Sequence, residues 1–438
     1  MICRYLGNKQ SILDRLMGVV GAHCALGDHV VDIFSGSLSV SLALKRAGYR
    51  VTSNDINLLS AIIGEAYLTP TAPPAVKLTD LARGRTRELR GWAKDQLPEL
   101  DLPTDFVADD ERRTAYVDLL AVIHHLATLG PDDVPKGYLR NDFFDTYCES
   151  GRRSAFVSSR GSSGRRRFFS PDNARRIDLI LSTVRAWRRE GRIDRAAEAV
   201  LLSVLMRAVE MVSNTQGTYH DFPRSEWDSR ALKPLRMQAP PADFWLPGVD
   251  GHRVGREEDS LEFIGTVGPH RLLYIDPPYN FRQYTAYYFL LNVLCRYPEL
   301  DDLDGYFAGV TYVRGQNPDD DFSSTFCKAA AFIEALGGLI RDAEAEYVVI
   351  SYFTGRNHWS QFDVGPSDTG KHLISELLSG TMFEPGSLSV VEVPRTNYAS
   401  YGGFKARTVN ELLLVARKRD VSASGSSDDS GEWLPTVA

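Results

Sequence analysis

Strand-like and helical segments alternate in the first sixty residues, and this alternation constrains the fold more than any other feature of the chain. Apolar residues recur at helical spacing over residues 11–20, and a short β-branched run over 29–34 stops at the small residues 35–37. A second helical pattern covers 40–47, and a second strand pattern follows over 50–53. The order predicts a β-α-β unit, which is the outline of a nucleotide-binding half-domain.

Strand patterns return in the last third of the chain. Residues 271–275 form an apolar run, and residues 347–352 form another after a helical stretch. Residues 388–393 and 411–416 are two further runs that can pair with each other. The later pair indicates an antiparallel hairpin that closes a mostly parallel sheet. Between the two groups of strands, charged helical segments separated by Pro and Gly predict an inserted helical region over 69–250.

The composition is that of a globular protein, since 43% of the 438 residues are hydrophobic and 24% are charged. The formal net charge of −7 gives no argument for a nucleic-acid partner, so such a partner needs a local basic patch. Five scattered cysteines without CxxC spacing favour neither a disulfide framework nor a zinc site. No run approaches the ~20 apolar residues of a membrane span. We expect a cytoplasmic protein with no membrane contact and no metal.

A local basic patch does exist, because residues 151–195 hold thirteen arginines against four acidic residues, a charge of +9. Glycine and serine are interleaved with the arginines from Arg160 to Arg167, which predicts a flexible strap that orders on phosphates. The alternative interpretation is a solvated helix face, the usual structure of a charge run. We predict DNA contacts for Arg160, Arg165, Arg166 and Arg167.

The residues at the ends of the first two strand patterns are suited to a nucleotide. The segment from Asp32 to Ser37 lies where a strand turns into a helix, and its small residues let a ligand approach backbone N–H groups. Asp55 ends the second strand, where an acidic side chain can accept both ribose hydroxyls of an adenosine-bearing cofactor. The alternative interpretation is an ordinary βαβ turn followed by a surface aspartate.

The tetrapeptide Asp276-Pro277-Pro278-Tyr279 directly follows a strand pattern. The prolines stop the ladder, so Asp276 and the Pro277 carbonyl project from the carboxyl end of the strand, where α/β sheets bind ligands. Two such acceptors, aimed at both N–H bonds of an exocyclic amine, free its lone pair for attack on a sulfonium methyl. Tyr279 offers a flat face on which a base can stack. The alternative interpretation is a surface turn.

Taken in order along the chain, these segments resemble the Dam-like N6-adenine DNA methyltransferase family, whose members carry an Asp-Pro-Pro-Tyr motif. Residues 5–9 resemble its aromatic-x-Gly-x-Lys segment, and residues 32–36 resemble its Asp-x-Phe-x-Gly segment. Residues 258–261 occupy the place of its acidic residue near the cofactor adenine, and residues 407–413 resemble its closing strand. Residues from about 70 to 165 have no counterpart in this resemblance.

The resemblance implies an α/β fold: a Rossmann-like S-adenosylmethionine-dependent methyltransferase sheet with seven strands and an inserted, mainly helical recognition region. It implies that the catalytic residues are Asp276, Pro277, Pro278 and Tyr279. It implies that S-adenosyl-L-methionine is the cofactor and is bound by Tyr5, Gly7, Lys9, Asp32, Phe34, Ser35, Gly36, Ser37, Asp55, Asp259 and Ser260. It also places four further residues at the DNA, namely Asn214, Thr215, Arg282 and Tyr284.

Some of these assignments have ordinary alternatives. The family places Lys9 near the carboxylate end of the cofactor, whereas a lysine near a helix start is usually solvated. The segment 213–219 is either a DNA-facing loop or a simple Asn/Gly turn. The chain departs from the family at Leu38, which stands where the second glycine of Gly-x-Gly is usual. Without that glycine we expect a less close approach of the backbone to the cofactor.

We therefore predict a site-specific DNA adenine-N6 methyltransferase that acts on a flipped-out adenine in double-stranded DNA. Its expected setting is restriction-modification or phage defence, beside a restriction endonuclease or another defence component. The expected organisation is a cofactor-binding half at 1–68, the recognition region at 69–250, a catalytic half at 251–419 and a disordered tail at 420–438. Two alternatives remain, an RNA adenine-N6 methyltransferase and a DNA-binding subunit with weakened cofactor binding.

Overall fold

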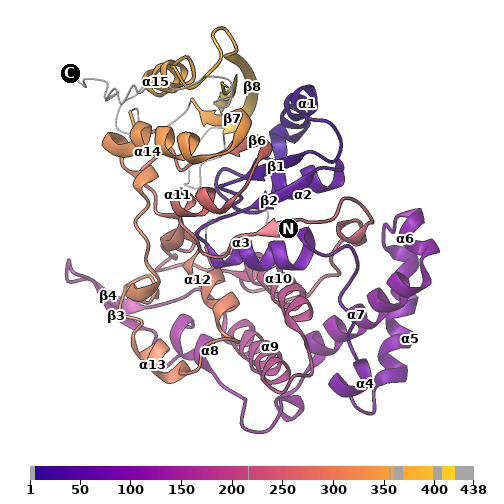
Figure 1. Cartoon of the computed structure of the whole chain (residues 1–438). Helices are drawn as coiled ribbons and strands as arrows, with labels where there is room; N and C mark the ends of the chain where they lie inside the picture. Colours follow the sequence, from indigo (N-terminus) through magenta and orange to yellow (C-terminus); the bar gives the residue numbers. More distant parts are fainter. Residues whose placement is uncertain (1–4, 216, 355–356, 360–367, 398–406, 420–438) are drawn as a thin grey trace.

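A computed structural model describes residues 5–215, 217–354, 357–359, 368–397 and 407–419 (Figure 1). Within these residues a seven-stranded sheet has the order β5-β2-β1-β6-β7-β9-β8, and β9 runs antiparallel between β7 and β8 while the other pairs are parallel. The predicted mostly parallel sheet with an antiparallel closing hairpin is confirmed. The predicted tail at 420–438 lies outside the described residues. The strands are β1 (His29–Asp32), β2 (Arg50–Ser53), β5 (Arg253–Val254), β6 (His270–Ile275), β7 (Ala345–Phe353), β8 (Ser389–Asn397) and β9 (Arg407–Arg417).

Helices cover both faces of the sheet. Successive strand residues point to opposite sides, and both sides carry apolar side chains that are buried under helices. Val30 and Leu272 belong to one buried cluster, and their neighbours Val31 and Leu273 belong to another. The first face is covered by α1 (Leu13–His23), α2 (Ser39–Arg46) and α3 (Leu58–Ile63), which continues as a π-helical turn over Gly64–Leu68. The second face is covered by α11 (Ser260–Phe263), α14 (Ala329–Asp342) and α15 (Thr369–Leu378).

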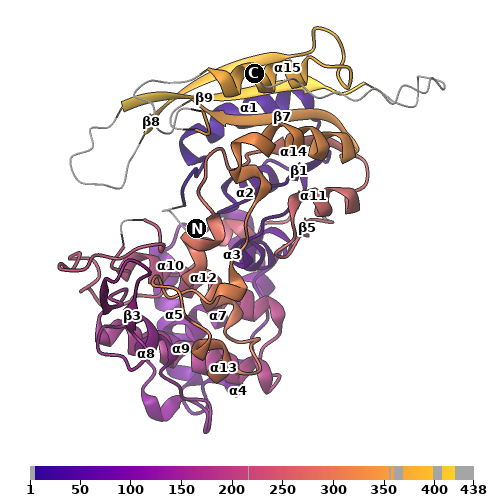
Figure 2. The ribbon, with the colours of Figure 1, turned by 90° about the vertical axis from the view of Figure 1, so that its left-hand side faces the viewer.

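The helical region inserted between β2 and β5 shares a core with the sheet. Trp187 and Leu201 from this region belong to the same buried cluster as Val30 of β1, so the division at residues 69 and 250 stays a proposal. Figure 2 shows these helices at one end of the molecule and β7, β8 and β9 at the other. No helix in the described part of the chain is long and apolar enough to cross a membrane. The helices of this end are α4 (Leu78–Leu81), α5 (Thr86–Gln96), α6 (Thr104–Ala108), α7 (Asp110–Thr128), α8 (Asp142–Tyr147), α9 (Pro171–Arg189), α10 (Arg195–Val212), α12 (Tyr284–Arg296) and α13 (Leu303–Ala308).

A short antiparallel hairpin, β3 (Ala155–Val157) and β4 (Ser163–Arg165), projects from this region (Figure 1). The Ser158 N–H donates to the Ser162 carbonyl at 2.7 Å, so the Gly/Ser-rich residues form the hairpin turn. The prediction of a flexible strap is therefore wrong for β4, because strand pairing satisfies its backbone groups.

Candidate active site

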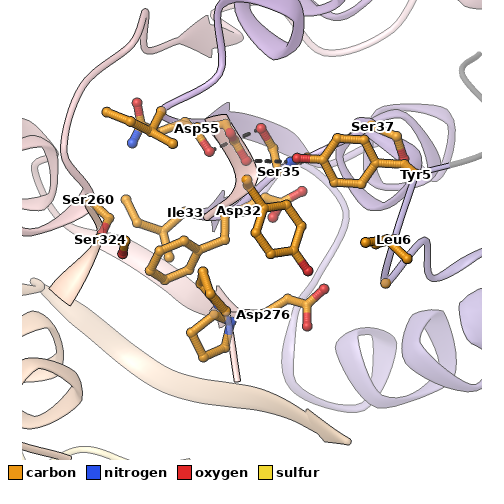
Figure 3. A pocket seen from close by; sticks show the side chains of 18 of the residues that line it. Tyr5, Leu6, Asp32, Ile33, Ser35, Ser37, Asp55, Ser260, Asp276 and Ser324 are labelled. Carbon is orange, nitrogen blue, oxygen red and sulfur yellow. Dashed lines mark hydrogen bonds between the residues drawn. The ribbon is translucent and has the colours of Figure 1, made fainter. Parts of the chain in front are cut away.

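A pocket opens at the carboxyl ends of β1, β2 and β6, with about 880 Å³ of empty space that is partly open to solvent. Figure 3 shows Tyr5, Asp32, Asp55 and Asp276 around this space. The predicted residues that line it are Tyr5, Gly7, Lys9, Asp32, Phe34, Ser35, Gly36, Ser37, Asp55, Asp259, Ser260, Asp276, Pro277, Pro278, Tyr279 and Tyr284. Segments that are far apart in the sequence therefore meet at the edge of the sheet where parallel strands end.

Asp55 lies just beyond β2 and is held in a fixed orientation by backbone donors. Its Oδ2 accepts the Gly36 N–H at 2.9 Å, and its Oδ1 accepts the Asn57 N–H at 2.9 Å and the Asn57 side-chain amide at 3.0 Å. Burial raises the pKa of Asp55, and these hydrogen bonds oppose the rise. The carboxylate keeps acceptor capacity toward the pocket, because each oxygen has two lone pairs.

The turn after β1 brings backbone close to Tyr5. Gly36 has φ +49°, and a Cβ on it would lie 2.7 Å from Cε1 of Tyr5, so this position requires glycine for both conformation and space. The Tyr5 ring also stacks on Tyr288 with a centroid distance of 4.2 Å. The segment from Tyr5 to Lys9 therefore forms one wall of the pocket through a close fit to the turn.

Leu38 keeps the backbone conformation that a glycine would allow. Its φ of +58° lies in the left-handed region, and its side chain is fully buried, near Gly64. A left-handed conformation costs a leucine about 1–2 kcal/mol, and burial of the side chain offsets that cost. We expected the backbone at Leu38 to approach the cofactor less closely than it would with glycine. The turn nevertheless keeps the left-handed conformation that a glycine would adopt.

Asp32 lines the pocket and has one buried oxygen with no hydrogen-bond partner among the described residues. Its Oδ2 accepts the Ser41 hydroxyl at 2.6 Å, whereas Oδ1 is buried without a partner. Burial raises the pKa of Asp32 to about 7, and the neighbouring Asp276 and Asp55 add to the rise. A buried orphan acceptor is costly, so the arrangement suits a ligand that brings a donor or a positive charge.

Asp259 and Ser260 lie on the side of the pocket next to β2. The Asp259 carboxylate accepts the Leu261 N–H at 2.9 Å and so caps α11, and the preceding Glu258 carbonyl accepts the Asn54 amide at 3.0 Å. These two bonds tie the loop to the end of β2. The loop thus forms part of the pocket lining together with Asp55.

The Asp276 end of the pocket contains a chain of alternating buried charges. Lys9 Nζ lies 2.8 Å from Asp276 Oδ1 and 2.6 Å from Glu411 Oε1. Arg395 Nη1 lies 2.9 Å from Glu411 Oε2, and the Ser351 hydroxyl donates to Glu411 Oε1 at 2.7 Å. The alternative of a solvated lysine is wrong, because the Lys9 side chain is only 2% exposed.

These contacts set the charge states of both carboxyl groups. Burial raises the pKa of Asp276 to about 6, and the Lys9 ammonium limits that rise. Burial also works to raise the pKa of Glu411, but Lys9 and Arg395 outweigh it and hold that pKa below its usual value. Lys9 thus favours the ionised form of both carboxyl groups, and Asp276 is the one that faces the pocket.

Tyr279 continues the pocket wall next to Asp276. Its ring lies 5.6 Å from the Phe353 ring, and the Lys9 ammonium lies 5.8 Å from the Tyr279 centroid. Tyr284, which we predicted to contact DNA, begins α12 and lines the same pocket. Its position is thus suited to a base inside the pocket. Arg282 is exposed on the loop between these two tyrosines.

The structure corrects one of the four arginine contacts predicted for residues 160–167. Arg166 is buried, and its guanidinium donates to the backbone carbonyls of Tyr312, Val313 and Arg153 at 2.9–3.1 Å. Its donors are engaged inside the protein, so the prediction that Arg166 contacts DNA is wrong. Charge count alone could not distinguish it from Arg165, which is exposed on β4.

Asn214 and Thr215 are also corrected, because both side chains are buried. The Asn214 amide donates to the Arg167 carbonyl at 3.0 Å and its oxygen accepts the Asp228 N–H at 2.9 Å. They stabilise the loop after α10 rather than facing DNA. Arg167 is half-buried against Glu149 and the Trp227 ring, whereas Arg160 is exposed at the hairpin turn.

Sequence reasoning missed Glu411, Arg395 and Ser351 as parts of the site. Glu411 was visible only as the first residue of the strand pattern at 411–416. A signal was present, since an acid directly before the apolar run Leu412-Leu413-Leu414 needs a buried partner. No local pattern identifies that partner.

A family model of the D12 class N6 adenine-specific DNA methyltransferases matches residues 5–79 and 139–303, which together make up more than half of the chain. Outside the match lie residues 80–138, which contain α5, α6 and α7, and residues 304–438, which contain β7, β8 and β9. The matched residues include both strand ends that carry Asp55 and Asp276.

Three curated relatives are similar to the chain. The type II methyltransferase M.FokI of Planomicrobium okeanokoites is 27% identical over 97% of this chain and 54% of its own length. The modification methylase LlaI of Lactococcus lactis subsp. lactis is 28% identical over 80% of this chain and 46% of its own length. The type II methyltransferase M.NlaIII of Neisseria lactamica is 33% identical over 44% of this chain and 53% of its own length. The chain thus spans about half the length of the curated relatives that it matches.

Proposed function

Because the chain belongs to the D12 class of N6 adenine-specific DNA methyltransferases, we propose that it transfers a methyl group from S-adenosylmethionine to the N6 amino group of an adenine in double-stranded DNA. We further propose that it does so in the cytoplasm, within a restriction-modification system and beside a restriction endonuclease. Relatives named as type II methyltransferases and as a modification methylase support that setting.

The observation that carries the proposal is the position of Asp276 at the pocket, directly before two prolines. The Asp276 carboxylate and the Pro277 carbonyl accept hydrogen bonds from the two N–H groups of the adenine amine. These bonds favour a tetrahedral nitrogen, whose lone pair is free to attack the methyl group. Tyr279 stacks on the flipped-out base, which repays part of the unstacking cost of a few kcal/mol. Arg160, Arg165 and Arg282 contact phosphates of the duplex outside the pocket.

The residues at the other end of the pocket fit S-adenosylmethionine. When bound, this cofactor supplies a methyl group on a positively charged sulfur. Asp55 accepts the ribose hydroxyls, Gly36 leaves room for close approach, and the orphan oxygen of Asp32 accepts a donor from the amino acid part. The retained conformation of Leu38 favours a working cofactor site over the alternative of a non-enzymatic DNA-binding subunit.

The test is methyl transfer from labelled S-adenosylmethionine to unmethylated duplex DNA, with sequencing of the product for N6-methyladenine. Asp276→Ala should lower the transfer rate at least ~100-fold, the usual cost of losing a group that stabilises developing charge, and leave DNA affinity nearly unchanged. A variant that keeps most of its activity would refute the role of Asp276. Faster methyl transfer to structured RNA of matching sequence would show that RNA, and not DNA, is the substrate.

A further inference from the structure

Four charged side chains from four different segments form a line of successive ion pairs that leads away from the pocket lining. In order they are Asp276, Lys9, Glu411 and Arg395, with ion-pair distances of 2.8, 2.6 and 2.9 Å. They come from the end of β6, the N-terminal segment, β9 and β8. The signs alternate along the line, so each inner charge is compensated on both sides.

The burial of these side chains increases from Asp276 to Glu411 and decreases again at Arg395. Asp276 is 16% exposed, Lys9 is 2% exposed, Glu411 is fully buried and Arg395 is 13% exposed. Asp276 and Lys9 line the pocket, whereas Glu411 and Arg395 do not. Glu411 therefore acts on the pocket from behind its lining, through its contact with Lys9 and through its negative charge, which works to raise the pKa of Asp276. The Ser351 hydroxyl, donating from β7, fixes the Glu411 carboxylate further.

Building on the proposed function, we propose that Glu411 is a positioning residue that holds Lys9 against Asp276 Oδ1, so that the second oxygen, Oδ2, stays charged and directed at the adenine amine. Lys9 shared between two carboxylates neutralises Asp276 only in part. Asp276 thus remains a strong acceptor for the N–H bond. Arg395 in turn balances Glu411, which allows a carboxylate to stay ionised in the protein interior.

Charge arithmetic predicts opposite effects for the two central residues. Methyl transfer needs an ionised Asp276, so the rate falls as pH drops through the pKa of this group. Lys9→Met leaves the carboxylates of Asp276 and Glu411 without the cation between them, which raises the pKa of Asp276. The low-pH limb of the rate profile then moves to higher pH. Glu411→Gln leaves Asp276 as the one carboxylate beside Lys9 in this line, which lowers the pKa of Asp276. The limb then moves to lower pH. Each shift should be about one pH unit at these separations.

Other titratable groups around Asp276 do not change these signs. The pKa values of the surrounding phenols are raised well above the usual range by burial, so these groups stay neutral over the range tested; they are Tyr5, Tyr274, Tyr279 and Tyr284. The carboxyls of Asp32 and Asp55 also lie at the pocket, and both are unchanged in the variants. The signal of Asp276 must therefore be observed separately from theirs.

The test combines single-turnover methyl transfer between pH 5 and 9 with carbon-13 NMR titration of labelled aspartate carboxyls. The Asp276 signal is assigned by its loss in Asp276→Asn. Glu411→Gln preserves the side-chain shape, the double variant Lys9→Met with Glu411→Gln restores the charge balance, and Arg417→Met removes an exposed cation from the same strand as a control.

Opposite shifts in the two single variants, return in the double variant and no shift in the control would support the proposal. Lower rates with an unmoved limb and an unmoved Asp276 titration would overturn it, because that is the pattern of a merely structural role. A wild-type chain that methylates no DNA would refute the proposed function instead. The NMR titration needs no substrate and would still test the role of Glu411.

Discussion

The pocket and the arginine-rich segment 151–195 were both predicted to carry function, yet they differ in how the predictions turned out. At the pocket, every predicted catalytic and cofactor residue lies along one lining. In the segment, Arg166 is buried, Arg167 is half-buried, and Arg160 and Arg165 are exposed. Residues at the end of a strand have their place fixed by the backbone, whereas a long arginine side chain can reach partners in any direction.

The acids that neutralise the segment come mostly from other parts of the chain. Arg152 and Arg153 pair with Asp145 and Asp142, and Arg189 pairs with Asp301. Arg195 pairs with Glu65, Glu198 and Glu299. The local charge of +9 therefore overstates what a DNA phosphate would meet.

The largest effect on binding should come from Asp55→Ala at the pocket. Loss of two hydrogen bonds from cofactor hydroxyls to a charged group should weaken S-adenosylmethionine binding by about 100-fold, measured by calorimetry. Asp14→Ala, which changes an exposed acid on α1, is the control and should bind normally. Unchanged affinity in Asp55→Ala would mean that Asp55 does not bind the cofactor. The prediction for the pocket would then have failed at this residue, as the prediction for the arginine-rich segment failed at Arg166.

Arg166→Met should lower the free energy of unfolding by about 3 kcal/mol, since three buried carbonyls lose a charged donor. Arg160→Met, at an exposed position of the hairpin turn, should cost less than about 1 kcal/mol. Chemical denaturation measures both. If Arg166→Met instead kept its stability and lost DNA affinity, Arg166 would contact DNA after all.

Leu38→Gly tests whether the strained turn serves the cofactor or the core. Relief of the left-handed strain should return about 1 kcal/mol, while loss of the buried side chain costs about 3 kcal/mol, so a net loss of about 2 kcal/mol is expected. Cofactor affinity should hardly change, because the turn is already in the conformation that glycine allows. A clear gain in affinity would mean that Leu38 does weaken the site.

The sequence predicted the sheet because its signals are local. The runs at 29–34, 50–53 and 271–275 became β1, β2 and β6, and the late pair became the β8–β9 hairpin. The strand ends then fixed the positions of Asp55 and Asp276. Such positions follow from chain direction alone, since parallel strands end at one edge.

The charge line could not be predicted because its contacts are not local. Lys9 and Glu411 are 402 positions apart and meet only when β9 enters the sheet beside β7. Similarly, Arg166 contacts carbonyls of Tyr312 and Val313, about 147 positions away. Predicting either contact requires the register of strands or loops that no local pattern specifies.

The smallest effect should come from Arg160→Ala at the hairpin turn. Arg160 is exposed and has no ion pair among the described residues, so its charge is available to a phosphate. Loss of one phosphate contact should weaken binding to duplex DNA only a few-fold at physiological salt and lower the slope of log affinity against log salt by about one. Arg175→Ala, at an exposed position on α9, is the matched control, and binding titrations at several salt concentrations measure both. An unchanged slope in Arg160→Ala would place DNA elsewhere than on the hairpin and would leave the arginine-rich segment with a structural role alone.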